Sequence, residues 1–202
     1  MILERYFPSE SVSSWKGPIV PRLIYEPLSF TMSANLTASG NGSTSVSIFK
    51  TSGAFDWDNH AYVSTAFTAP CTIEFNKWSA SDDNGRSYAM IAWNTDPTTN
   101  ANYTSLDYAS FPYRTDTYSV YNNGTQVHFS GAWSRTSRFY IVYGTDGYIR
   151  HYNGATQLYN VNYGNSSTTF YVDSSFHSPG ATFGGLSNIR VIKKAWNGSS
   201  YS

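Results

Sequence analysis

Short stretches of alternating apolar and polar residues recur along the chain from Val46 onward, with turn residues between them. Cys71, Ile73 and Phe75 share one face of such a stretch, and this period of two is typical of a half-buried strand. No window of eleven residues sustains a helical stripe of apolar positions, so we expect very little helix. The pattern predicts strands over residues 46–49, 61–67, 71–78, 87–93, 117–121, 125–130, 138–143, 148–152, 155–161, 168–172 and 188–194.

Turn dipeptides fix how these strands connect. Asp146-Gly147 and Asn153-Gly154 bracket a five-residue strand rich in aromatic and β-branched side chains, and Asn123-Gly124 marks a second hairpin. A strand of that length between two tight turns belongs to an antiparallel meander, because parallel strands need a long crossover. The chain is therefore predicted to be an all-β, antiparallel two-sheet β-sandwich or jelly roll.

The N-terminal stretch has a different character. Four of the eight prolines lie within the first 27 residues, which favours extended or turn backbone over regular ladders, and residues 38–44 are rich in Gly, Ser and Asn. We predict an extended N-terminal arm over residues 1–44, used for docking or oligomerisation, and a jelly-roll domain over 45–202. The arm's apolar side chains need a surface, which its own domain, a sister subunit or a host structure could supply. The alternative is a first strand with a frayed end.

Composition narrows the class of partner. The 202 residues carry no formal net charge, charged residues make up 13 %, and no Lys/Arg run occurs, so binding to nucleic acid or anionic lipid is not expected. Aromatic residues reach 17 %, and with many Ser, Asn and Gly they are typical of an adhesive surface. An ordinary sandwich with Tyr-rich strands is the alternative.

Neither a disulfide nor a targeting segment is indicated. Cys71 is the only cysteine and begins an apolar strand, so we expect a small buried side chain. The first residues lack a basic region followed by an apolar run, so no secretion signal is expected. No apolar run approaches the roughly 18 residues of a membrane span, so no membrane insertion is expected either.

Catalytic chemistry finds little support. A glycoside hydrolase needs two facing carboxylates, about 5–5.5 Å apart for retention, and beyond the N-terminal arm the only glutamate is Glu74. Asp56 and Asp58 lie near a strand start, where a turn or a cation explains them better than catalysis; a calcium site with Asn59 stays open. The four histidines lack zinc-site spacing, and no nucleophile elbow or phosphate loop occurs. We expect no enzymatic activity, no cofactor and no metal.

The succession of motifs points to a family. Asp56-Trp57-Asp58 is followed by Met90-Ile91-Ala92-Trp93-Asn94, Asp96-Pro97, Leu106-Asp107-Tyr108-Ala109, the Asn123-Gly124 turn and the Asp146–Gly154 hairpin. Over about residues 46–195 this order resembles the concanavalin A-like (lectin/glucanase, SPRY-like) jelly-roll modules of bacterial surface proteins and bacteriophage virion proteins. The resemblance implies a binding or structural module that often contacts glycans and is usually not an enzyme.

The resemblance also implies a setting. We expect a non-enzymatic phage virion surface protein, on a tail fibre, tail tip or capsid, assembled in the host cytoplasm and adhering to a host surface glycan. Its partners would be other virion proteins, reached through the arm, and copies of itself, with a trimer favoured. A purely structural capsid or tail cement protein without glycan binding is the alternative.

Exposed aromatic residues with polar neighbours are the candidate carbohydrate site, because the C–H groups of a sugar pack on aromatic faces and its hydroxyls need polar partners. The longest irregular stretch, residues 94–114, holds Tyr103, Asp107, Tyr108, Tyr113 and Arg114, and Trp133 lies in another expected loop. We predict carbohydrate binding by Tyr103, Asp107, Tyr113 and Trp133. In modules of the family that the chain resembles, the Asp107-Tyr108 pair looks like a fold-determining turn, which is the alternative for Asp107. Arg150 and His151 point to opposite faces of one strand, so at most one of them joins a surface site.

Overall fold

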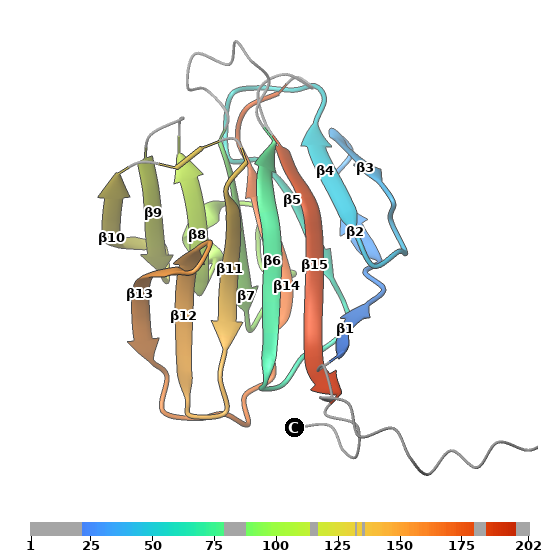
Figure 1. Cartoon of the computed structure of the whole chain (residues 1–202). Coiled ribbons are helices and arrows are strands. Elements are labelled where there is room, and N and C mark those ends of the chain that lie inside the picture. Colours follow the sequence, from blue (N-terminus) through green and yellow to red (C-terminus); the bar gives the residue numbers. More distant parts are fainter. Residues whose placement is uncertain are drawn as a thin grey trace, which may run out of the picture.

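Two antiparallel sheets pack face to face in the computed structural model, which describes residues 22–78, 88–113, 117–131, 133–134, 136–179 and 185–196 (Figure 1). The eight-stranded sheet runs β13 (Thr156–Asn162), β12 (Tyr148–Asn153), β11 (Arg138–Tyr143), β6 (Cys71–Trp78), β15 (Gly185–Trp196), β4 (Val46–Lys50) and β3 (Leu36–Ser39), with β1 (Arg22–Glu26) paired to β15. The seven-stranded sheet runs β10 (Thr125–Gly131), β9 (Thr117–Asn122), β8 (Tyr108–Tyr113), β7 (Ala89–Asn94), β14 (Tyr171–Phe176), β5 (Asn59–Val63) and β2 (Phe30–Met32).

The predicted fold class, an all-β antiparallel sandwich of two sheets, is confirmed. The one helical segment among the described residues is the short 3-10 turn η1 (Tyr103–Ser105). No helix in the described part of the chain is long and apolar enough to cross a membrane.

The period of two sets which side chains form the core between the sheets. Phe139, Ile141 and Tyr143 of β11 all point inward and are fully buried, while the side chains between them face outward. Cys71 is buried as expected, and burial raises the pKa of its thiol to about 12. His151 is fully buried and Arg150 is half-exposed, which confirms that they face opposite ways.

Residues 22–44 belong to the sandwich, which corrects the predicted arm boundary at residue 44. β1 pairs with β15, β2 with β5 and β3 with β4, and Leu28, Phe30 and Leu36 enter the core. The Gly/Ser/Asn-rich stretch holds a turn in which the Asn41 side chain bonds both the N–H and the C=O of Phe30, at 2.7 and 3.2 Å. The prolines near this stretch misled the prediction, because Pro27 lies just after β1 instead of inside it. The rest of the expected arm, residues 1–21, lies outside the described residues.

The predicted irregular stretch 94–114 is wrong in its second half, where β8 lies. Ala109, Ser110 and Pro112 are weak strand formers, but β8 is buried on both faces, pairs with β9 along its length and pairs with β7 over its first three residues. The strand expected at 168–172 lies at 171–176, and the strand expected at 61–67 ends at Val63. Phe67 instead forms an isolated bridge with Phe170.

The hairpins are confirmed at Asn123-Gly124 and at the turn glycines Gly147 and Gly154. Asn123 and Gly124 both have positive φ (46° and 71°), as a two-residue primed turn between antiparallel strands requires. A Cβ on Gly124 would meet the backbone of Thr104 at 2.8 Å, so this turn also needs a glycine for its close contact with η1.

Candidate functional site: an aromatic pocket on the seven-stranded sheet

The outer face of the seven-stranded sheet carries its own apolar cluster, separate from the core. Met90 and Ala92 of β7 and Ala109 and Phe111 of β8 are buried there beneath Leu106. Strand alternation explains the arrangement, because the β7 residues between them, Ile91 among these, point into the core instead. The β4–β5 and β7–β8 connections cross this face and supply further aromatic side chains. The result is a pocket of about 210 Å³ that opens outward.

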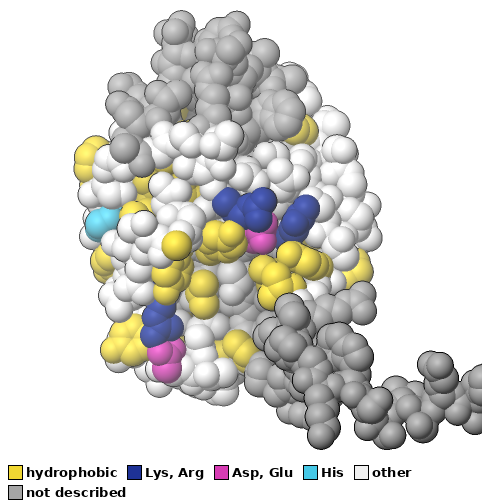
Figure 2. Space-filling view, viewed as in Figure 1, with side chains coloured by type: hydrophobic (Ala, Val, Ile, Leu, Met, Phe, Trp, Pro, Cys, Tyr) yellow, Lys and Arg dark blue, Asp and Glu magenta, His cyan; other side chains and the backbone are white. Residues whose placement is uncertain are grey.

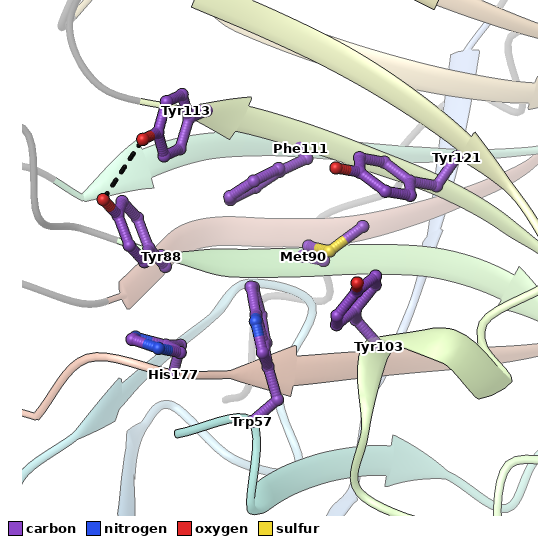
Figure 3. A pocket seen from close by; sticks show the side chains of 8 residues that line it. All are labelled: Trp57, Tyr88, Met90, Tyr103, Phe111, Tyr113, Tyr121 and His177. Carbon is purple, nitrogen blue, oxygen red and sulfur yellow. Dashed lines mark hydrogen bonds between the residues drawn. The ribbon is translucent and has the colours of Figure 1, made fainter. Parts of the chain in front are cut away.

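Aromatic residues make up nearly all of the pocket lining. The pocket is lined by Trp57, Tyr88, Met90, Tyr103, Phe111, Tyr113, Tyr121 and His177 (Figure 3). Seven of these side chains form a closed circuit of ring contacts with centroid distances of 4.9–6.1 Å: Trp57–Tyr103, Tyr103–Tyr121, Tyr121–Phe111, Phe111–Tyr113, Tyr113–Tyr88, Tyr88–His177 and His177–Trp57. The eighth, Met90, comes from the strand beneath them. Separations and tilts of this kind are the favourable geometry for aromatic pairs, so the rings hold one another in place.

The lining is uncharged near neutral pH. Burial, and after it the nearby Lys50 ammonium, lowers the pKa of His177 below its usual 6.5. Burial, and then Tyr103 and Tyr113, raises the pKa of Tyr121. No described lining residue is an Asp, Glu, Lys or Arg. The polar groups are hydroxyls, an indole and an imidazole, and the Tyr88 and Tyr113 hydroxyls bond each other at 3.2 Å. The pocket therefore suits a neutral ligand with both apolar faces and hydroxyl groups.

A buried lysine positions one wall of the pocket. Lys50 is fully buried, and its Nζ donates to the carbonyls of Ala54 (2.7 Å), Asp56 (3.0 Å) and His177 (3.0 Å) and to the Asp58 carboxylate. These bonds tie the loop that carries Trp57 to the residue that follows β14. Lys50 thus fixes two neighbouring rings of the circuit.

The same contacts explain the Asp56 and Asp58 pair. Burial would raise the pKa of Asp58, but hydrogen bonds from Lys50 and Asn59 outweigh it and lower the pKa. Asp56 accepts a hydrogen bond from the N–H of Trp57 at 2.7 Å, as in a turn. Both carboxylates therefore stabilise the β4–β5 loop. The described residues contain no group of three or more His, Cys, Asp or Glu that could hold a metal ion.

The β7–β8 connection brings in Tyr103 and explains Asp107. Asp107 Oδ2 accepts hydrogen bonds from the N–H (2.8 Å) and hydroxyl (2.6 Å) of Thr95, so it fastens the two ends of this connection together. Ser175 of β14 donates to the carbonyl of Ala101 at 2.6 Å and holds the connection against the sheet. Asp107 lies outside the pocket lining, and its contacts match the turn alternative.

Only some of the predicted site residues line the pocket. Tyr103 and Tyr113 both line the pocket. Trp133 does not line it, and the exposure expected for Trp133 is wrong: it is 7 % exposed, donates its indole N–H to the carbonyl of Thr117 at 2.8 Å and packs on Phe139. Tyr108 points into the core, and Arg114 lies outside the described residues. Sequence reasoning missed Phe111, although it shares a strand face with Tyr113 two positions away, and it missed the other lining residues, Trp57, Tyr88, Met90, Tyr121 and His177.

Glu74 lies far from this chemistry, on the outer face of the eight-stranded sheet. It is almost fully buried, with Oε1 3.4 Å from Arg138 Nε and 3.8 Å from Arg190 Nη1. Figure 2 shows this face, with acidic atoms between basic ones near its centre. Glu74 neutralises arginines and faces away from the pocket on the other sheet.

Comparison with known proteins supports the fold. No protein-family model matches the sequence, and no similar sequence was found among curated proteins. Several solved structures share the architecture. The PSpry domain of TRIM65 has a TM-score of 0.54 at 12 % identity, over 83 % of this chain and 90 % of that one. The exoplasmic/lumenal domain of VIP36, in a Ca²⁺/Man2-bound form, has a TM-score of 0.53 at 11 % identity, over 82 % and 80 %. A Bacillus licheniformis β-glucanase has a TM-score of 0.51 at 10 % identity, over 85 % and 98 %. Identities this low speak for the fold alone.

Proposed function

We propose that this chain is a carbohydrate-binding module that takes a neutral sugar ring in the aromatic pocket. The closed circuit of seven rings is the observation that carries the proposal. A pyranose presents C–H groups on its faces and hydroxyls around its edge, and the pocket offers ring faces beside tyrosine hydroxyls. The lectin-like architecture shared with VIP36 is consistent with this use.

Binding without catalysis is part of the proposal. A glycosidase needs two carboxylates across the sugar, and among the described residues none lines the pocket. Because a β-glucanase shares the fold, activity needs a direct test. Release of reducing sugar from a neutral glucan that disappears in the Tyr103→Ala variant would place an enzymatic activity in this pocket and contradict this part of the proposal.

The biological setting that we propose is a phage virion, where the module would adhere to a host surface glycan from a tail fibre, tail tip or capsid. The order of motifs, the low charge and the abundance of tyrosine support this setting. Residues 1–21 would dock on other virion proteins, and the protein would assemble as a homo-oligomer, with a trimer favoured.

A glycan array tests the binding proposal directly. We expect the wild type to bind neutral glycans and the Tyr103→Ala variant to lose most of that binding, because Tyr103 supplies one wall of the pocket. Tyr152→Ala is the matched control, since Tyr152 is a half-buried tyrosine on the other sheet, with its hydroxyl bonded to Gln157. Signals for the wild type no higher than background, or equal losses in both variants, would contradict the proposal.

The cement alternative calls for a different experiment. Deleting residues 1–44 would remove β1, β2 and β3 and unfold the sandwich, so the informative truncation removes residues 1–21 only. If docking through this segment is correct, the truncated protein folds but is absent from assembled particles. Normal incorporation of the truncated protein would refute the docking role.

A further inference from the structure

Two exposed phenylalanines flank the pocket on opposite sides. Among the described residues four large apolar side chains are exposed, and the two most exposed are Phe129 at 65 % and Phe55 at 57 %. Phe55 lies in the β4–β5 connection and makes an edge contact with His177, with ring centroids 6.3 Å apart. Phe129 lies on β10, the edge strand on the other side of the pocket.

Strand register places Phe129 in line with the pocket. Phe129 pairs with Ser119, and Ser119 pairs with Phe111, so the three lie in one row across β10, β9 and β8. Neighbouring strands are about 4.8 Å apart, which puts Phe129 about 10 Å from Phe111 along this row. Ser119 is small and buried, and Gln126 donates to its hydroxyl at 3.0 Å. Along this row the residue between the exposed ring and Phe111 is therefore a small serine, with the Gln126 amide bonded to its hydroxyl.

On the other side of the pocket, β7 and β14 lead toward Phe55. Met90 of β7 pairs with Ser175 of β14, and His177 follows β14 and contacts Phe55. In Figure 3, Phe111, Tyr113 and Tyr121 lie on one side of Met90, and Trp57 and His177 lie on the other. From β10 to β14 there are four strand spacings, about 19 Å. The two phenylalanines thus mark the ends of a track that crosses the strands and passes over the pocket.

The strands beneath the track add no exposed charge, and the carboxylates nearest to it, Asp56 and Asp58, lie in the loop at the Phe55 end, where Asp58 pairs with Lys50. On the outward-facing side of β10, β9, β8, β7 and β14, the described residues include no Lys, Arg or Glu, and the one Asp, Asp173, is buried. A single sugar ring would fill the pocket and leave both phenylalanines in water. A linear chain of sugar rings would cover all three positions and bury the exposed rings against further C–H faces.

From this geometry we infer a second and a third stacking position, at Phe129 and Phe55, so that the module binds the interior of a linear neutral polysaccharide, not a single terminal sugar. This inference rests on the proposed function and goes beyond it, because it assigns two residues outside the pocket and a ligand length.

Titration calorimetry with neutral oligosaccharides of two lengths tests the inference. The probes are the disaccharides and hexasaccharides of β-1,4-glucan, β-1,3-glucan and mannan. We expect the wild type to bind a hexasaccharide at least about tenfold more tightly than its disaccharide, and Phe129→Ala and Phe55→Ala each to weaken the hexasaccharide about fivefold. Disaccharide affinity should stay unchanged in both variants. Leu23→Ala is the control, since Leu23 is 48 % exposed on β1 of the other sheet.

The outcomes separate the two proposals. Equal affinity for short and long probes, or a hexasaccharide affinity unaffected by both substitutions, overturns the track and leaves the pocket standing. No binding of any probe by the wild type overturns the proposed function and the track together. Both phenylalanines are exposed, so their replacement should leave the thermal unfolding midpoint of the protein unchanged.

Discussion

Replacing Lys50 by Met should both destabilise the sandwich and disable the pocket. Methionine keeps the length and the apolar stem of the side chain but removes the ammonium that four acceptors share. Three of these are the carbonyls of Ala54, Asp56 and His177, and the fourth is the Asp58 carboxylate. The loop that carries Trp57 would then lose its attachment to the residue after β14.

The size of the effect follows from these contacts. Each partly buried carbonyl left without a donor costs about 1 kcal/mol, and the ion pair adds at most about 1 kcal/mol because Asp58 is 41 % exposed. Relief from burying a charge offsets a part of this. We expect a net loss of about 2 to 4 kcal/mol, out of the roughly 5 to 15 kcal/mol that stabilise a domain.

Urea unfolding followed by tryptophan fluorescence measures this loss. With an m value of about 2 kcal/mol per molar, the midpoint should fall by about 1 to 2 M at unchanged slope. Lys193→Met is the control, because Lys193 is 41 % exposed and its Nζ is 3.5 Å from Glu26, an exposed pair that contributes less than about 1 kcal/mol. A Lys50→Met protein with the wild-type midpoint, or one that binds sugar as the wild type does, would refute the role assigned to Lys50.

Three further predictions concern buried polar side chains. Burial, and then His128, lowers the pKa of His151 to about 3. The unfolded chain takes up this proton first, so the free energy of unfolding should fall as the pH drops from about 6.5 to 3, by roughly 3 to 4 kcal/mol. His151→Gln should remove this fall, measured by urea unfolding across the same pH range. Burial raises the pKa of Asp173 to about 7. The folded protein holds this proton more tightly than the unfolded chain, so the stability that the protonated carboxyl contributes is lost as the pH rises from about 4 to 7. In the Asp173→Asn variant the urea midpoint should therefore fall less between pH 4 and pH 7 than in the wild type. The opposite sign in either series would contradict the burial argument. Trp133→Phe should lower the free energy of unfolding by about 1 to 2 kcal/mol, because the indole hydrogen bond is lost, and should leave glycan binding unchanged. Weakened glycan binding would show that Trp133 belongs to the binding site.

Local pattern predicted most of the sheets because alternation and turn dipeptides act over a few residues. The Asn123-Gly124 hairpin and the inward face of β11 needed only neighbours in sequence. β8 was missed because its burial on both faces, and not the β-propensity of Ala109 or Pro112, makes it a strand.

Only a part of the pocket lining could be predicted, because several lining residues meet through long-range strand pairing. Tyr103 and Tyr113 stood out because both lie in one tyrosine-rich stretch. Trp57 and His177 are far apart in sequence, and they meet only because β14 pairs between β5 and β7. Trp133 was correctly placed outside the regular strands, but its burial depends on Phe139 and Thr117, which no local pattern joins to it.

The pairing of β1 with β15 also sets how the sandwich responds to mechanical force. Arg22 lies opposite Trp196, so the chain enters and leaves the described fold side by side. A pull applied between these two points would load the β1–β15 hydrogen bonds one pair at a time, like a zipper, because the bonds lie across the antiparallel strands. The sandwich would therefore resist a pull through its two ends only weakly, since the bonds of this pair break in sequence and not together.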